Sequence, residues 1–152
     1  MAIRNIVTLG DDVLRKICRT QMTFDEKLWS LLDDMADTLE KSNGVGLAAP
    51  QIGINKAVIA VCRVDKPGAP FEVYPNIRIV SYSPEMEIMP EGCLSIPGRR
   101  EYVDRSFAVE VEYFSMEAQK IVRDTIRDYA ARIFQHEIDH LDGKLYTDRV
   151  TY

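Results

Sequence analysis

Residues 135–143 read QHEIDHLDG, and the rest of the fold has to be built around this stretch. It contains the only two histidines of the 152-residue chain, His136 and His140, with Glu137 between them. Histidines four residues apart lie on one face of a helix, where both rings can reach a single metal ion. A glutamate beside the first histidine can accept a proton from water without itself binding the ion. The stretch therefore predicts a helix that carries a metal site and a proton acceptor.

Apolar residues extend this helix toward the N-terminus. Ile126, Tyr129 and Ile133 fall on the same stripe as the two histidines when the sequence is given helical periodicity. Gly143 supplies the stop that commonly ends a helix. We therefore expect a helix that begins near Ile126 and ends before Gly143, with both histidines on its apolar face.

Two imidazoles leave a metal site incomplete, so a third ligand is required. In helical zinc sites of this spacing the third ligand is often a His six residues after the second, but the residue six positions after His140 is Tyr146. Only twelve residues follow His140, which leaves no room for a second ligand-bearing helix after it. The third ligand must therefore come from upstream. The best candidate is Cys93 in EGCLSIPG, between two prolines that keep the segment out of a helix or a central strand. Two imidazoles and one thiolate leave a position open for water, as catalytic sites do.

The other two cysteines suit a different role. Cys62 lies in an apolar run and Cys18 in an amphipathic stretch, so each is interpreted as a small buried hydrophobic residue. Three widely spaced cysteines do not form a disulfide framework, and they fit a reducing compartment.

The remaining elements follow from periodicity and turn residues. Thr23 and Glu26 have the spacing of a capping box, and a helix is expected over 24–42, ended by Asn43 and Gly44. The Gly-rich segment 44–53 is expected to be a loop. Strands are expected at 57–64, 71–74, 77–81 and 107–113. We predict an α+β fold in which residues 1–152 form a single domain, with mixed or antiparallel short-stranded sheets around a central metal-binding helix.

Composition narrows the functional classes. The net charge is -5 and no block of Lys and Arg occurs, which argues against sequence-specific nucleic-acid binding. We find no signal peptide, transit peptide or apolar run long enough for a membrane helix. A cytoplasmic protein without a membrane partner is therefore expected.

Three segments together carry a family resemblance. GVGLAAPQ at 44–51, EGCLS at 91–95 and QHEIDHLDG at 135–143 resemble the signature segments of peptide deformylases, in the same order and at similar separations. The resemblance implies a hydrolase that removes the N-formyl group from the initiator formyl-methionine of new polypeptides and releases formate. It also implies one divalent metal ion, Fe(II) in cells, with zinc, nickel or cobalt able to occupy the same ligands.

The resemblance also assigns roles to individual positions. Glu137 would be general base and then general acid, while the Gln51 amide and the Leu94 backbone N–H would stabilise the oxyanion. The residues implied to contact the substrate are Gly44, Val45, Gly46, Met89, Tyr129 and Ile133. Glu91 and Arg105 would form an internal ion pair that orders the loop carrying Cys93.

The chain departs from the family pattern in two places. Asp128 stands where many members have Gly, so the rim of the pocket is expected to differ. The chain also stops at Tyr152, without the further C-terminal helix that bacterial members use at the ribosome. This short form is therefore not expected to dock on the ribosome in that way, and a bacterial or virus-infected bacterial cell is the expected setting.

Two alternatives from other classes remain at this point. One is a metallopeptidase that uses the His-Glu-x-x-His motif on internal amide bonds. The other is a non-catalytic metal-binding module, in which Cys18 or Cys62 would close the site as a fourth ligand.

Overall fold

The structure is a computed structural model, and it describes residues 2–151. Its α-helices are α1 (Glu26–Ser42) and α2 (Asp128–Leu141). Its strands are β1 (Gly46–Ala48), β2 (Val58–Cys62), β3 (Phe71–Pro75), β4 (Arg78–Tyr82), β5 (Met86–Cys93), β6 (Ile96–Ser106), β7 (Ala108–Ser115) and β8 (Lys120–Arg127). Three short 3-10 helices complete the order: η1 (Asp12–Arg15), η2 (Ala49–Ile52) and η3 (Tyr146–Arg149).

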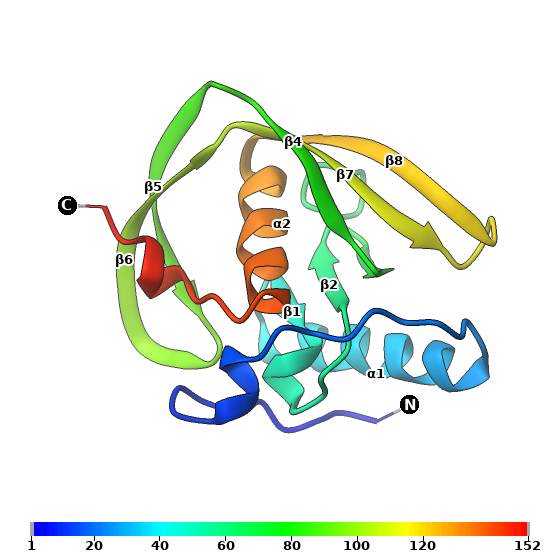
Figure 1. The fold of residues 1–152 in the computed structure, drawn as a ribbon. Helices are drawn as coiled ribbons and strands as arrows, with labels where there is room; N and C mark the ends of the chain where they lie inside the picture. The colour runs from blue at the N-terminus through cyan, green and yellow to red at the C-terminus, as the bar shows by residue number, and fades with distance from the viewer. Residues whose placement is uncertain (1, 152) are drawn as a thin grey trace.

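The strands form three antiparallel sheets arranged around α2 (Figure 1). One sheet has the order β1-β2-β3, a second has the order β4-β7-β8, and β5 pairs with β6 alone as a long hairpin. In Figure 1, α2 stands in the middle, with the hairpin on one side and β1 and β2 on the other. An α+β fold with a central helix is therefore confirmed, and its sheets are antiparallel rather than mixed.

Helix α2 is buried along almost its whole length. Ala131 and Phe134 are fully buried in a core shared with β2 and β7, while His140 on another face is equally buried. A helix enclosed on several sides has little freedom to shift, so its side chains are held in place. Among the described residues, no helix is both long and apolar enough to cross a membrane.

Helix α1 covers the sheet β1-β2-β3 with an apolar stripe that includes Leu28, Leu32, Met35 and Leu39. Its predicted end is confirmed, because Asn43 adopts a left-handed conformation with φ of 61°. The predicted start is wrong by two residues. Asp25 and not Thr23 caps the helix, and its carboxylate accepts a hydrogen bond from the backbone N–H of Leu28 at 3.2 Å.

Several strands differ from the prediction, each for a physical reason. The segment expected to be a loop contains β1, which pairs with β2. Strands β5 and β6 were not predicted, because Pro90 and Pro97 interrupt them. A two-stranded hairpin tolerates proline because each strand keeps an unpaired edge. Ile126 belongs to β8 rather than to the helix, and it pairs with Val109 across the sheet.

The turn from β8 into α2 depends on Asp128. This residue has φ of 61°, and its backbone N–H bonds to the carbonyl oxygen of Phe107 at 2.8 Å. Left-handed backbone suits Gly best, Asp and Asn less well, and β-branched residues poorly. The Gly that the resemblance implies at this position would therefore have a conformational explanation.

We predict that Asp128→Val destabilises the protein by about 1–2 kcal/mol, because a β-branched side chain cannot adopt this φ without strain. Asp128→Gly should leave the stability unchanged or raise it. Urea unfolding of both variants measures the difference. Equal stability of Val and Gly at this position would contradict the conformational explanation.

Candidate metal centre and active site

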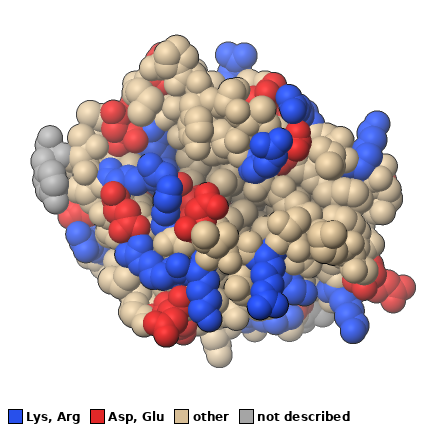
Figure 2. All heavy atoms as spheres, in the orientation of Figure 1, with Lys and Arg blue, Asp and Glu red and all other residues tan. Residues whose placement is uncertain are grey.

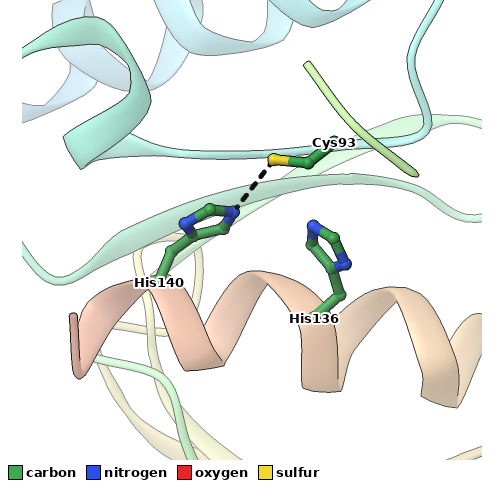
Figure 3. A group of neighbouring side chains, drawn as sticks. All are labelled: Cys93, His136 and His140. Atoms are coloured by element: carbon green, nitrogen blue, oxygen red, sulfur yellow. Dashed lines mark hydrogen bonds between the residues drawn. The ribbon is translucent and has the colours of Figure 1, made fainter. Parts of the chain in front are cut away.

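Cys93, His136 and His140 meet between α2 and the tip of the β5–β6 hairpin, where both histidines are buried (Figure 3). Their ligand atoms all lie within 4.8 Å of one another, and Cys93 Sγ is 3.5 Å from His140 Nε2. Both histidines project from one side of α2, and Cys93 reaches them as the last residue of β5. Neither Cys18 nor Cys62 belongs to the group, so among the described residues no second cysteine closes the site.

The donor set fits a divalent ion. A tetrahedral ion with bonds of about 2.3 Å to sulfur and about 2.0–2.1 Å to nitrogen needs donor separations close to the one between Cys93 and His140. Burial, followed by the charge on His136, lowers the pKa of His140 well below its ordinary value, so this ring is the neutral form that binds metals. Burial disfavours charge on His136 as well. That effect is outweighed by the Glu137 carboxylate, Cys93 and Glu91, which raise the pKa of His136 to about 10. The groups around this ring therefore favour positive charge at its position.

Glu91 fixes the orientation of His136. Its Oε1 lies 2.8 Å from His136 Nδ1, which leaves Nε2 for the metal. Arg105 donates two hydrogen bonds to the same carboxylate, at 2.5 and 2.9 Å, so the predicted ion pair is present. Burial alone would raise the pKa of Glu91, but the bonds from His136 and Arg105 lower it to about 2. The carboxylate is therefore ionised and holds His136 Nδ1–H as a donor.

Glu137 is buried beside the three metal-binding atoms. Its Oε1 accepts no hydrogen bond from the described residues, and its Oε2 lies 3.9 Å from His136 Nε2. Burial raises the pKa of this carboxyl group to about 7. A pKa near neutrality suits a group that must first accept and then return a proton.

Gly46 makes room for Glu137. A Cβ atom built on Gly46 would lie 2.4 Å from Glu137 Oε2 and 2.8 Å from Cδ. The resemblance implies that this glycine contacts the substrate, and the structure shows a further reason for it in the protein itself. At Gly44 the nearest atom is the side chain of Leu94, at 2.9 Å.

Gln51 points its amide nitrogen toward the metal centre. Its Oε1 accepts a hydrogen bond from the backbone N–H of Ala48 at 2.9 Å, which fixes the direction of the amide. Its Nε2 lies 3.4 Å from Cys93 Sγ and 3.2 Å from Ser95 Oγ. A buried donor held beside the metal ligands is suitably placed to stabilise negative charge.

A cavity of about 610 Å³ opens onto these residues. Most of the predicted site residues line it: Gly44, Val45, Gly46, Gln51, Glu91, Cys93, Leu94, Tyr129, Ile133, His136 and Glu137. Met89 is not among the lining residues, and it pairs with Val103 in the hairpin instead. The structure therefore provides no support for Met89 as a pocket residue. Arg105 and His140 lie behind the cavity wall, in contact with Glu91 and Cys93 respectively.

Sequence reasoning missed several residues of the site. Arg132 donates to Glu91 Oε2 at 2.6 Å, and Asp139 accepts from Arg105 Nη1 at 3.0 Å. Ser95 orients Gln51, and it lies within EGCLS although it was given no role. Arg132 could have been noticed as a charged residue one helical turn before His136 on a buried helix.

The comparisons with known proteins agree with this geometry. The family model described as Polypeptide deformylase matches residues 3–152. A peptide deformylase from Finegoldia magna is 39% identical over 99% of this chain and 91% of its own length. One from Acetivibrio thermocellus is 44% identical over 99% of this chain and 85% of its own length.

Solved structures of the same family superpose on the chain. The crystal structure of peptide deformylase from Thermotoga maritima has a TM-score of 0.92 and 36% identity, and the match covers 100% of both chains. A Met-Ala-Ser-bound class I type b peptide deformylase from Acinetobacter baumannii has a TM-score of 0.90 and 35% identity, over 98% of this chain and 99% of the other. The comparisons do not favour a general metallopeptidase or a non-catalytic metal-binding module.

We predict that Gly46→Ala lowers the rate of the catalysed reaction by at least about tenfold, because the new methyl group must displace the Glu137 carboxylate from its proton-transfer position. Turnover and thermal stability are measured for this variant and for the wild type, so that a folding defect is distinguished from a displaced carboxylate. Wild-type turnover in Gly46→Ala would contradict the assignment of proton transfer to Glu137.

Proposed function

The chain belongs to the peptide deformylase family, whose members remove the N-formyl group from formyl-methionyl peptides with the help of a divalent metal ion, and we propose the residue roles by which it does so. Cys93, His136 and His140 hold the ion, and Glu137 transfers the protons. The observation that carries the proposal is the buried Glu137 carboxylate, which has an unpartnered oxygen beside three converging metal-binding atoms.

The ion supplies Lewis acidity, which acidifies water and polarises a carbonyl group. Glu137 takes one proton from the attacking water, whose oxygen forms a bond to the formyl carbon. The carbon–nitrogen bond then breaks, and Glu137 returns the proton to the departing amine nitrogen. Formate and a free N-terminus result, so one carboxyl group serves in both steps.

Two donors stabilise the negative charge that develops on the formyl oxygen. Gln51 Nε2 is held at the cavity wall by the bond from Ala48 to its oxygen, so no reorientation is needed during the reaction. Leu94 directly follows Cys93 and lines the same cavity, which makes its backbone N–H the second donor. Removal of one such donor typically raises the barrier by about 2.7–4 kcal/mol.

The cavity receives the methionyl end of the peptide. Ile133 and Val45 provide apolar surface in it, and Tyr129 stands at its rim with 40% of its surface exposed. Gly44 and Gly46 lie along one wall, where the peptide backbone can pass closely. The binding of Met-Ala-Ser by the deformylase from Acinetobacter baumannii supports this placement, because the two structures superpose closely.

We further infer that the ion in cells is Fe(II), with zinc, nickel or cobalt able to replace it. The mixed thiolate and imidazole set suits all four ions, so availability rather than affinity selects among them. Residues 1–152 are proposed to act as one catalytic domain in the cytoplasm of a bacterial or virus-infected bacterial cell. Nascent formyl-methionyl chains are the proposed substrates.

We predict that Glu137→Gln lowers formate release from a formyl-Met peptide by about 10²–10⁴-fold, because the amide cannot accept the proton. Gln has nearly the same shape, so the ligands should keep their metal. Formate release is compared at equal metal content, determined by elemental analysis. A variant that retains metal and activity would remove Glu137 from the proton-transfer role.

We also predict that the iron-loaded protein loses activity in air, whereas the zinc- or nickel-loaded protein retains it. Cys93 is only partly buried and faces the cavity, so oxygen can reach a thiolate there. Cys18 provides an internal control, because burial raises the pKa of its thiol to about 11 and disfavours the reactive thiolate. Mass spectrometry of the peptides containing Cys93 and Cys18 follows the oxidation. Survival of activity in air with iron still bound would contradict the prediction.

A further inference from the structure

The chain that follows α2 turns back onto the metal centre. After Leu141 it forms η3, whose Tyr146 is 1% exposed, and then it runs along the β5–β6 hairpin. Val150 forms a bridge with Val103, and the backbone N–H of Thr151 bonds to the carbonyl oxygen of Tyr102 at 2.8 Å. In Figure 1 this segment runs from the lower end of α2 toward β6, and its short helix lies beside β6. No role in the reaction has been given to it so far.

Arg149 connects η3 to the metal centre through a continuous series of ionic contacts. Its guanidinium group binds both oxygens of Asp139, at 2.5 and 3.0 Å. Asp139 Oδ2 also accepts from Arg105 Nη1 at 3.0 Å. Arg105 holds Glu91, and Glu91 holds the ring of His136. Four consecutive contacts therefore join the C-terminal turn to a metal ligand.

Asp139 and Glu91 compete for the same guanidinium group. Arg105 is 4% exposed and contacts both carboxylates, so each of them needs partners of its own. With Arg149 bound to Asp139, Arg105 can give two of its hydrogen bonds to Glu91. Without Arg149, Arg105 would be the only ion-pair partner left to Asp139 among residues 2–151, and Asp139 would draw it away from Glu91, because a buried carboxylate without a partner is costly.

A second contact reaches the same histidine. The ring of Tyr146 stacks on the ring of His136, with centroids 5.8 Å apart and an angle of 21° between their planes. The Tyr146 hydroxyl donates to the carbonyl oxygen of Arg99 at 2.9 Å, and Arg99 lines the cavity. The turn thus touches both the ligand ring and the cavity wall.

We propose that η3 is a positioning element of the metal centre, which keeps His136 oriented for metal binding through Arg149 and Tyr146. The inference rests on the proposed ligand set but concerns residues to which that proposal gives no role. Arg149 acts through Asp139, Arg105 and Glu91, so it is a positioning residue rather than a catalytic one. Outer partners of metal ligands typically change metal affinity or activity by about 10–100-fold when they are removed.

The test compares Arg149→Met with Arg15→Met. Arg15 pairs with Asp148 and donates to the carbonyl oxygen of Gly143 at 3.4 Å, so it holds the same turn from its other side, but neither contact involves Asp139 or Glu91. Both arginines are partly exposed, at 39% and 50% of their side-chain surface, so both variants are expected to fold. Zinc affinity is measured without oxygen by competition with a chromophoric chelator. The visible spectrum of the cobalt-loaded protein reports the ligand geometry.

Arg149→Met should weaken zinc binding about tenfold, which is the lower end of the range for outer partners, because its contact with the ligand is indirect. The visible bands of the cobalt-loaded variant should also shift. Arg15→Met should match the wild type in both measurements, with a similar small loss of thermal stability. Equal zinc affinities and cobalt spectra in the two variants would overturn the proposal, because the turn would then act only on stability.

The experiment separates this inference from the residue roles proposed above. Formate release by the wild-type protein and by Glu137→Gln tests those roles and does not depend on Arg149. An active wild type with unchanged metal binding in Arg149→Met refutes the positioning role alone. An active Glu137→Gln variant, together with weakened zinc binding in Arg149→Met, refutes the proton-transfer role alone.

Discussion

The buried carboxylate of Glu91 joins the two halves of the active site. It sits on β5, two residues before Cys93, and it accepts hydrogen bonds from Arg105 on β6 and from Arg132 and His136 on α2. A carboxylate that is 6% exposed would be strongly destabilising by itself, and the two guanidinium groups and the imidazole offset that cost. Because its partners come from two separate elements, the ionised Glu91 fixes the hairpin relative to the helix. The distance between the thiolate and the two imidazoles follows from this connection.

The site lies between the buried helix α2 on one side and Gly46 of strand β1 on the other. Helix α2 presents both histidines from a buried position, and the His136 ring is oriented there by Glu91 and Tyr146. Strand β1 passes so close to Glu137 that only a residue without a side chain fits at Gly46. The same carboxylate is thereby kept out of water, which raises its pKa toward the value that proton transfer near neutral pH needs. Gly46 thus connects the packing around Glu137 with the pKa of its carboxyl group.

The charged side chains on the surface are exposed to water, whereas those behind the metal centre are buried. On the face shown in Figure 2, many Lys and Arg side chains lie next to Asp or Glu side chains. Exposed pairs such as Arg15 with Asp148 contribute little to stability, since water competes with them. The group formed by Glu91, Asp139, Arg105 and Arg132 is buried, so each member depends on the others.

The sequence alone determined the helices and strands that have strong apolar periodicity. It also determined the metal-binding residues, because His and Cys are rare in this chain. Helix α1, strand β2 and the spacing of His136 and His140 followed from repeated apolar positions, and Cys93 followed from the need for a third ligand. The tertiary structure decided what depends on partners distant in the chain. The hairpin was missed because its proline-containing strands gain their pairing only from each other, and Ile126 was assigned to the wrong element because its spacing fits both periods. Arg132 carries only a weak local signal, and Asp139 and Arg149 carry none, since a charged residue can be buried only where distant groups come together to neutralise it.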